Sequence, residues 1–317
     1  MAGKPLPDSL AAEGSMMLQA LLGELKLLPQ IELLVAVDER CLHLPELANV
    51  ETVVINAQQN VLDVLPQLIA LCDAVWPIAP ETDGVLATIA RLVTAQQKIL
   101  LASCVEAILV CGDKLATYDL LHALYLPVVA TQLLKDFMPA AGRYVIKPRD
   151  GVGCLGGVII DDGRCLPERL LNTAAPELYL IQPYHQGLAI SLSCLFKQGR
   201  GWLICCNRQQ IAIVDHGFQL TGCVVNTGNE NFGFYQQLVS NIAAAIPGLW
   251  GYVGIDLLET PDNGPLILEI NPRLTTSYVG IMVATGVNVA GQVLALVDAE
   301  PEEWLVREVG FEIEVVV

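Results

Sequence analysis

The chain has 317 residues, a formal net charge of −17, and 53% hydrophobic but only 16% charged residues. A chain of this length can bury a large core and form two or three lobes. The strong negative charge disfavours nucleic acid and anionic membrane surfaces as partners. The 10 cysteines are scattered without a Cys-x-x-Cys pair, which argues against a zinc site and is typical of reduced thiols in a cytoplasmic protein.

No stretch of the sequence predicts a membrane span or a signal peptide. The longest uncharged segments, residues 179–196 and 231–255, are interrupted by Pro, Gly, Asn or Gln. The chain does not open with a charged stretch followed by an apolar one. We therefore expect a globular α/β protein in the cytoplasm, without a membrane partner.

Residues 1–112 are predicted to form an N-terminal domain in which helices and strands alternate. The strand patterns cover residues 31–37, 52–55, 74–78 and 99–102, and the helix patterns cover residues 14–28, 61–72, 83–97 and 104–110. This alternation is typical of a doubly wound parallel sheet, so we expect a Rossmann-like fold. Such a domain normally begins with a strand, and none is recognisable before residue 14. Either that first strand is missing or the sheet is one strand short.

Residues 113–185 are predicted to form a second, smaller lobe. It opens with a helix pattern at 114–124, and strand patterns cover residues 126–129, 143–147, 158–160 and 178–183. The glycine-rich stretch 148–157 joins two of these strands, and its backbone N–H groups can close over phosphate oxygens. An ordinary hairpin tip fits this stretch equally well. It matches neither the Rossmann fingerprint, because no helix follows, nor the Walker pattern.

The third region, residues 186–317, contains a predicted β-hairpin with an unusual set of polar side chains. Apolar, β-branched runs flank a turn at residues 261–264, which is the pattern of a hairpin. Side chains alternate along a strand, so Glu269 and Asn271 share a face. A loop of two or four residues sets Asp256 opposite one of them. Two carboxylates and an amide oxygen suit Mg²⁺; the alternative is a solvated polar face, although unpaired charge in such apolar strands is costly.

Five elements occur along the chain in a characteristic order. Lys114 opens a helix, Lys147 ends a strand before the glycine-rich stretch, and an extended segment covers 182–187; Asp256 and the run Glu269-x-Asn271-x-Arg273 follow. This order resembles the ATP-grasp superfamily over nearly the whole chain. The resemblance implies an N-terminal domain followed by two α+β lobes that clamp ATP. It also implies that an acyl phosphate forms on a carboxylate before a nitrogen nucleophile attacks it.

The resemblance also implies roles for individual residues. Arg273 is expected to stabilise the transferring phosphoryl group, and Arg208 is a second catalytic candidate for which a structural salt bridge is the alternative. Residues 275–278 are expected to meet the acid or the amine, with core packing as the alternative for Tyr278. The remaining implied contacts are phosphate binding by Lys114 and Lys147, a lid of Gly151, Gly153, Gly156 and Gly157, adenine binding by Gln182, Pro183, Tyr184 and His185, and Mg²⁺ binding by Asp256, Glu269 and Asn271.

Four segments narrow the resemblance: residues 12–17, 76–83, 113–118 and 270–280 are similar to the tyramine–glutamate ligases of methanofuran and methylofuran biosynthesis. This implies an ADP-forming ligase for glutamate and tyramine or a related amine, with ATP and Mg²⁺ as cofactors and a homodimer as a possible assembly. One alternative is the same chemistry on other amino-acid or cofactor-precursor substrates. Another is a nucleotide-binding scaffold with weak turnover, because Ala189 stands where many family members carry a ribose-binding acidic residue.

Overall fold

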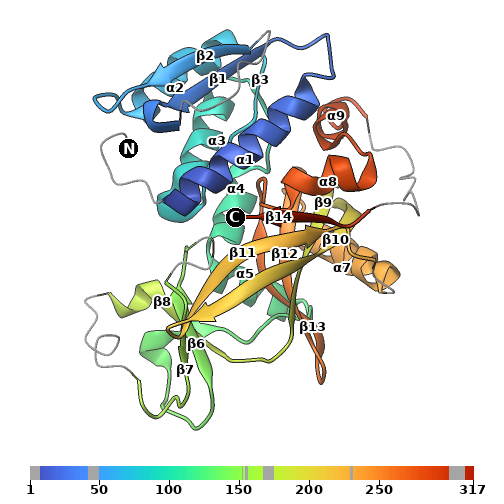
Figure 1. Ribbon diagram of the computed structural model, residues 1–317. Helices are drawn as coiled ribbons and strands as arrows, with labels where there is room; N and C mark the ends of the chain where they lie inside the picture. Colours follow the sequence, from blue (N-terminus) through green and yellow to red (C-terminus); the bar gives the residue numbers. More distant parts are fainter. Residues whose placement is uncertain are drawn as a thin grey trace.

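The computed structural model describes residues 8–41, 50–151, 153, 156–166, 175–228, 231–299 and 311–317. An N-terminal domain lies above a large sheet, and the long strands β10 and β11 cross the middle of the molecule (Figure 1). The large sheet has ten strands in the order β13-β12-β9-β10-β11-β7-β6-β8-β5, with β14 paired to β11. A single sheet therefore runs through both the second and the third predicted lobes.

The N-terminal domain confirms the predicted alternation of helices and parallel strands. Its elements are α1 (Asp8–Leu25), β1 (Leu33–Asp38), η1 (Glu39–Cys41), β2 (Val50–Ile55), α2 (Val61–Leu71), β3 (Ala74–Val75), η2 (Thr82–Gly84), α3 (Val85–Ala95), β4 (Ile99–Leu100) and α4 (Val105–Gly112). The expectation of one doubly wound sheet is wrong in detail. Among the described residues, β1 pairs with β2 and β3 pairs with β4, both in parallel, but the two pairs are separate sheets.

Helix α1 begins before the predicted start at residue 14 and packs on two sides. Leu22 joins Val35 and Val37 of β1 in one apolar cluster. Leu21 and Leu25 belong to a different cluster, which also contains side chains of the two helices near the C-terminus. A helix with apolar residues on two faces has to be covered on both. Helix α1 therefore connects the N-terminal strands to the large sheet's helical layer (Figure 1).

The second lobe is built on antiparallel strands. Its elements are α5 (Lys114–Ala123), β5 (Gln132–Leu133), η3 (Leu134–Asp136), β6 (Tyr144–Pro148), β7 (Val158–Ile160), η4 (Pro176–Leu178) and β8 (Tyr179–Pro183). Strand β6 pairs with both β7 and β8. The predicted strand at 126–129 is instead a single bridge, in which Val128 pairs with Ile267. Residues 152, 154 and 155 of the glycine-rich stretch lie outside the described residues.

The third region holds the long strands and the helices that cover them. Its elements are β9 (Leu188–Lys197), β10 (Arg200–Val214), β11 (Gly217–Val225), α7 (Phe232–Ala245), β12 (Gly251–Thr260), β13 (Gly264–Asn271), α8 (Tyr278–Thr285), α9 (Val289–Ala295) and β14 (Ile313–Val316). Within the part of the chain described, no single helix is long and apolar enough to cross a membrane. Helices α8 and α9 pass that test of length and composition only as a pair, bent by 99°.

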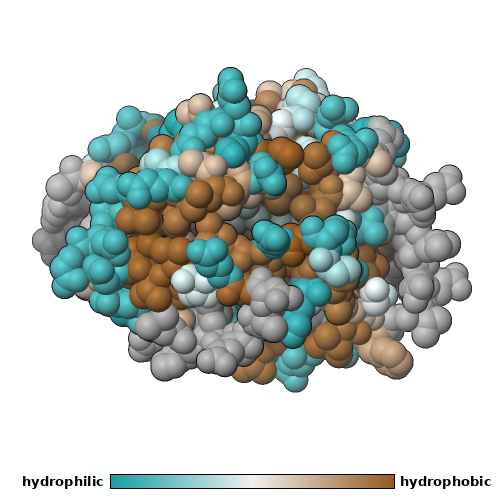
Figure 2. Space-filling view, turned by 90° about the horizontal axis from the view of Figure 1, so that it is seen from above, coloured by the Kyte–Doolittle hydropathy of each residue, from teal (hydrophilic) through white to brown (hydrophobic). Residues whose placement is uncertain are grey.

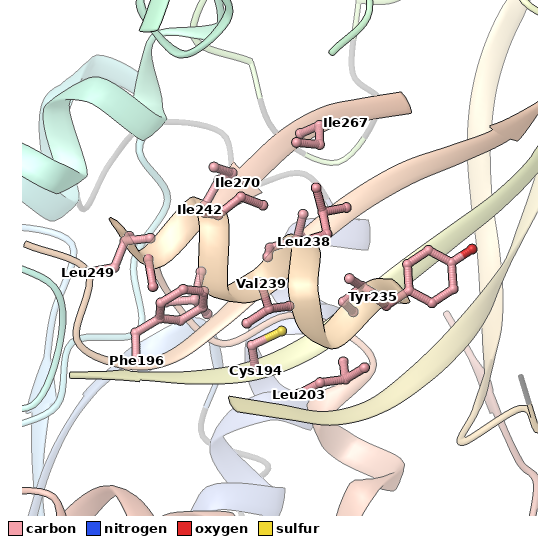
Figure 3. Packing of buried hydrophobic residues seen from close by; sticks show 14 of the residues in the cluster. Cys194, Phe196, Leu203, Tyr235, Leu238, Val239, Ile242, Leu249, Ile267 and Ile270 are labelled. Carbon is pink, nitrogen blue, oxygen red and sulfur yellow. The ribbon is translucent and has the colours of Figure 1, made fainter. Parts of the chain in front are cut away.

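The core forms because strand side chains alternate between two helical layers. Cys194 and Phe196 of β9 pack against Val239 and other side chains of α7 (Figure 3). Leu195, between them in sequence, lies on the opposite face in the cluster that includes Tyr278 of α8. This period of two places successive side chains in different cores. The strands of the site are therefore covered on one face by α7 and on the other by α1, α8 and α9.

Apolar side chains also reach the surface of the N-terminal domain. Figure 2 shows apolar residues gathered across the middle of the face seen from above, with polar residues around them. The exposed large apolar side chains of this domain include Leu27, Val54 and Leu71. Patches of this kind occur at protein interfaces, so the surface is compatible with the expected homodimer, which stays a prediction.

Candidate functional site

A cavity of about 550 Å³ lies where the N-terminal domain, the second lobe and the large sheet meet. This volume is in the range of small-molecule sites. Its walls are mostly apolar, including Val129, Val145, Leu258 and Phe218, and polar groups converge at a few points. Nearly all the residues that the sequence singled out border this space, including Lys114, Lys147, Gly151, Gly153, Gln182, Pro183, Tyr184, His185, Asp256, Glu269, Asn271 and Arg273.

The hairpin β12–β13 places two carboxylates directly opposite each other. Thr260 pairs with Gly264, so the loop has three residues, neither the two nor the four that the sequence suggested. With that loop alone, Asp256 would face Leu268. A β-bulge between Asp256 and Leu257 shifts the register, and Asp256 pairs with Glu269 instead. The predicted pairing is therefore confirmed, but a bulge produces it rather than the loop length.

The two carboxylates have opposite pKa shifts because their neighbours differ. Burial and the adjacent charge of Glu269 raise the pKa of Asp256 above its usual range. Burial alone would also raise the pKa of Glu269, but Lys114 and Lys147 outweigh it and hold that pKa low. Asp256 accepts hydrogen bonds from Gln209 Nε2 at 2.8 Å and from Asn271 Nδ2 at 3.0 Å. A cation between the two carboxylates would relieve their mutual repulsion.

The oxygen atoms of the hairpin side chains fit a divalent cation that prefers oxygen ligands. Asp256, Glu269 and Asn271 supply two carboxylates and an amide oxygen on one face of one hairpin, and all three border the cavity. Mg²⁺ is typically bound through one or two carboxylates, with substrate phosphates and water as its other ligands. Among the described residues, no three His, Cys, Asp or Glu side chains lie close enough together to hold a metal ion by themselves. The described side chains therefore do not complete the coordination shell of a cation by themselves.

Lys114 is held at the site by the start of α5. Its Nζ lies 3.1 Å from Glu269 Oε2 and also donates to the carbonyl oxygen of Gly151. Asp113 caps the helix by accepting from the backbone N–H of Leu115 at 3.0 Å, and it pairs with Arg149 at 2.5 Å. These bonds join the helix start, the hairpin that carries the two carboxylates and the beginning of the glycine-rich stretch. The ammonium group of Lys114 is therefore held between Glu269 and the glycine-rich stretch.

Arg273 is positioned by the N-terminal domain, which the sequence did not predict. Its Nε donates to Glu81 Oε2 at 2.8 Å, and its two Nη atoms donate to Leu274 O at 3.0 Å and to Asn271 Oδ1 at 3.3 Å. Glu81 is buried, and its Oε1 has no hydrogen-bond partner among the described residues. The guanidinium is thereby oriented next to the hairpin carboxylates. Glu81 lies in one of the segments that carried the narrower resemblance, but nothing in the sequence paired it with Arg273.

The predicted adenine hinge lies at the end of β8. Gln182 is buried, and its Nε2 donates to Thr131 Oγ1 at 2.7 Å. The backbone N–H of Tyr184 donates to Arg143 O at 2.9 Å, and the Arg143 guanidinium lies 4.2 Å from the centre of the Tyr184 ring. Apolar side chains of β6, β11 and β12 border the same cavity. The hinge residues are thus fixed by these bonds, and the cavity that they border has apolar surfaces on which a flat base can stack.

The glycines of the 148–157 stretch divide into two groups. Gly151, Gly153 and Gly157 border the cavity, as the lid hypothesis requires. Gly156 does not, so its predicted contact with ATP is not supported. Its φ is 75°, and an added Cβ would lie 3.0 Å from Pro148 Cγ. Gly156 therefore serves the turn itself, because this conformation strongly favours glycine.

Arg208 does not border the cavity, so the structure lends no support to its predicted catalytic role, which stays a prediction. Its side chain is exposed, whereas the neighbouring Gln209 borders the cavity and bonds Asp256. Alternation along β10 puts the two side chains on opposite faces. Strand β10 has register shifts at Leu203/Cys205 and at Gln210/Ile211. Since these shifts are not visible in the sequence, the inward-facing residue could not be chosen from the alternation pattern.

A hydroxyl network supports the cavity floor after Arg273. Thr275 Oγ1 lies 2.9 Å from Tyr252 OH and 3.0 Å from Ser277 Oγ. Tyr252 OH lies 3.0 Å from Ser193 Oγ in the large sheet. Thr275 and Ser277 border the cavity, whereas Tyr278 is fully buried and its OH donates to Glu24 Oε2 at 3.0 Å. Tyr278 therefore has the core role that was the alternative, and its neighbours face the cavity.

Comparison with known proteins agrees with this arrangement. Residues 111–277 match the model of the ATP-grasp domain family, and residues 31–108 match that of the pre ATP-grasp 3 domain. The chain is similar over its whole length to the structure of an ATP-grasp superfamily protein from Archaeoglobus fulgidus. That similarity has a TM-score of 0.71 at 23% identity and covers 96% of the other chain, so it shows the fold.

Two sequence relatives are ligases. A tyramine–L-glutamate ligase of Methanocaldococcus fervens is 30% identical over 209 residues, which are 66% of this chain and 61% of that enzyme. A glutamate–LysW ligase of Sulfurisphaera tokodaii is 28% identical over 198 residues, which are 58% of this chain and 68% of that enzyme. The chain thus spans less than two thirds of the first relative's length. Both names include glutamate, and their second substrates differ.

Proposed function

Because the chain belongs to the ATP-grasp family, we propose that it is a ligase that uses ATP to join a carboxylate to an amine. The carboxylate of the acid attacks the γ-phosphorus of ATP, the bond to ADP breaks, and an acyl phosphate forms. The amine nitrogen then attacks the carbonyl carbon, phosphate leaves with the bonding electrons, and the nitrogen releases a proton. ATP, acid and amine thus become amide, ADP and phosphate.

The observation that carries this proposal is that Asp256 and Glu269 lie opposite each other on paired strands, with Lys114 at 3.1 Å from Glu269. Asp256, Glu269 and Asn271 would hold Mg²⁺, which neutralises phosphate charge when it is bound. Lys114 and Lys147 are compact point charges suited to phosphate oxygens. Arg273 provides a planar, permanently charged fork next to them, which suits a transferring phosphoryl group.

Within this chemistry, we propose glutamate as the acid and tyramine or a related amine as the nucleophile. The support is the similarity to the Methanocaldococcus fervens enzyme, whose name states both substrates. The Sulfurisphaera tokodaii relative favours glutamate too, but with a different acceptor. A place in methanofuran or methylofuran biosynthesis depends on the amine and stays a prediction. A homodimer and a cytoplasmic location also stay predictions.

The test is phosphate release from Mg·ATP with L-glutamate, scanned over a panel of amines that includes tyramine. We expect release that requires both glutamate and tyramine, with the amide product identified by mass spectrometry. Release with glutamate and another amine would keep the chemistry and change the acceptor. If ATP binds but no acid and amine in a wide panel support turnover, the protein is a nucleotide-binding scaffold and the ligase proposal is wrong.

A further inference from the structure

One stripe of residues on helix α1 faces the cavity, which the end of β8 also borders. Leu10, Glu13, Gly14 and Met17 all border the cavity. Their spacing of three, four and seven residues is that of a single helical face. The mechanism proposed above uses none of these residues. The N-terminal domain therefore contributes a wall with one carboxylate and an otherwise apolar surface.

Glu13 differs from the other carboxylates at the cavity in its partners. Glu269 lies next to Lys114, and Asp256 accepts hydrogen bonds from two amide groups. Glu13 Oε2 accepts one hydrogen bond, from Thr276 Oγ1 at 3.1 Å. Within the ranges that the structure describes, no Lys, Arg or His side chain forms an ion pair with Glu13. A half-buried carboxylate held by one neutral hydroxyl retains the capacity to bind a cationic group.

The side chains around Glu13 are apolar, so they favour a cation that carries an apolar group. Met17 and Leu274 lie in one apolar cluster, and Ile78 packs against it. Ile78, Ala79 and Pro80 also border the cavity. A Cβ added at Gly14 would have no atom within 4 Å, so the space next to Glu13 is open. An ammonium group carried on an apolar arm fits this combination of one charge and apolar walls.

This inference rests on the proposed function and identifies one of its substrate sites. We propose that Glu13 and the apolar stripe of α1 form the acceptor subsite, in which the Glu13 carboxylate binds the ammonium group of the amine substrate. Thr276 orients the carboxylate, and Leu10 and Met17 contact the arm of the amine. The hydroxyl run from Thr275 to Ser277 connects this subsite to Arg273, where the acyl phosphate forms. Glu13 thus brings the amine to the reacting carbon. The ammonium group gives one proton to water before the neutral nitrogen attacks, and the nitrogen loses the second proton as the amide forms.

The experiment compares two nucleophiles in the Glu13→Gln variant. Hydroxylamine is small and uncharged near neutral pH, so it can trap the acyl phosphate as a hydroxamate without the subsite. Tyramine is cationic and needs the carboxylate. We expect Glu13→Gln to raise the KM for tyramine by about ten- to a hundredfold, the range for a lost charge-assisted hydrogen bond. Hydroxamate formation from glutamate should stay within about twofold of wild type.

Two further variants make the result specific. Glu51→Gln removes the same charge from an exposed position on β2. It should change neither the KM for tyramine nor the rate of hydroxamate formation. Gly14→Leu fills the open space without changing charge, so it should raise the KM for tyramine and leave hydroxamate formation unchanged. If Glu13→Gln lowers both rates equally, or changes neither, the acceptor subsite is wrong. Thermal unfolding of each variant separates these results from misfolding.

A failure of the proposed function gives a different result. In that case wild type forms no hydroxamate with any acid, whatever Glu13 does. Tyramine binding to wild type and to Glu13→Gln is then measured by titration calorimetry in the presence of Mg·ATP. Binding that Glu13→Gln weakens about tenfold or more supports the subsite even without turnover, and equal or absent binding to both proteins overturns it.

Discussion

On one side of the cavity the polar groups come from neighbouring strands of one sheet, whereas on the other side they come from a helix and a loop of the N-terminal domain. Asp256, Glu269 and Gln209 belong to the ten-stranded sheet, in which backbone pairing fixes their positions. Glu13 borders the cavity from outside that sheet, and Glu81, also outside the sheet, bonds Arg273 in the cavity wall. The first side carries the groups proposed to bind phosphate and metal, and the second carries groups that side-chain contacts between the domains hold in place.

The difference shows how one scaffold can keep its chemistry while its substrates vary. Strand pairing fixes the hairpin carboxylates regardless of what the N-terminal domain does. This domain docks through an apolar cluster, to which α1 contributes Leu21 and Leu25, and through polar contacts. The polar contacts include Glu81 with Arg273 at 2.8 Å, Glu13 with Thr276 at 3.1 Å, Glu24 with Tyr278 at 3.0 Å, and Asp150 with Thr82 at 3.1 Å. Substitutions in these contacts should alter substrate binding or orientation without disturbing the sheet.

The largest effect is expected on the sheet side, from Glu269→Gln. This change keeps the side-chain size but removes one of two carboxylates that face each other at the proposed metal site. We expect kcat to fall by about 10²- to 10³-fold, as for the loss of one group that stabilises a transition state. Phosphate release measures the effect, and circular dichroism should show an unchanged fold.

The metal dependence of wild type provides the control. Chelation with EDTA should abolish phosphate release, and added Mg²⁺ should restore it. Turnover that persists in EDTA would falsify the metal assignment. An equally active Glu269→Gln variant would show that the paired carboxylates are structural and that the sheet side of the cavity does not carry the metal site.

A smaller effect is expected from Glu81→Gln, which tests whether the N-terminal domain takes part in the chemistry. Glutamine can still accept from Arg273 Nε, but the bond is no longer between two charges. We expect kcat to fall about tenfold, with the KM for ATP within about twofold of wild type, because Arg273 is less firmly oriented. Asp83→Asn, in the same segment, is the matched control and should have little effect. An unchanged kcat would mean that Glu81 only docks the domain.

The sheet side and the N-terminal side of the cavity also differ in how much of each the sequence predicted. The hairpin follows from local patterns, namely a turn and alternation, whereas the roles of both lysines and of the hinge were implied by the resemblance to the ATP-grasp superfamily. The pairing of the two carboxylates was expected from the alternation, although a bulge sets the register. Gln209 was missed and Arg208 was chosen instead, because register shifts in β10 change which residues face inward. Features that depend on strand pairing were thus predictable except where a bulge intervened.

The substrate side could not be predicted in the same way. The bond between Glu81 and Arg273 joins residues 192 positions apart, and that between Glu13 and Thr276 joins residues 263 apart. Contacts of this kind follow from how two domains pack, and neither periodicity nor turn chemistry encodes them. The segments at 12–17 and 76–83 were singled out by the narrower resemblance, and both contribute residues to the cavity.

The smallest effect is expected from Glu24, which anchors α1 on the substrate side. Burial raises its pKa above 4.5, although the backbone N–H of Ala290 and the hydroxyl of Tyr278 donate to it and oppose the shift. A carboxyl with a raised pKa contributes stability below its unfolded pKa, and this contribution is lost as pH rises through the folded pKa. Wild type should therefore lose stability relative to Glu24→Gln as pH rises above about 4.5, by about 1.4 kcal/mol for each unit by which the pKa is raised. Urea unfolding of both proteins at several pH values measures this difference. A difference that does not change with pH would mean that Glu24 stays ionised and that its two hydrogen bonds fully offset its burial.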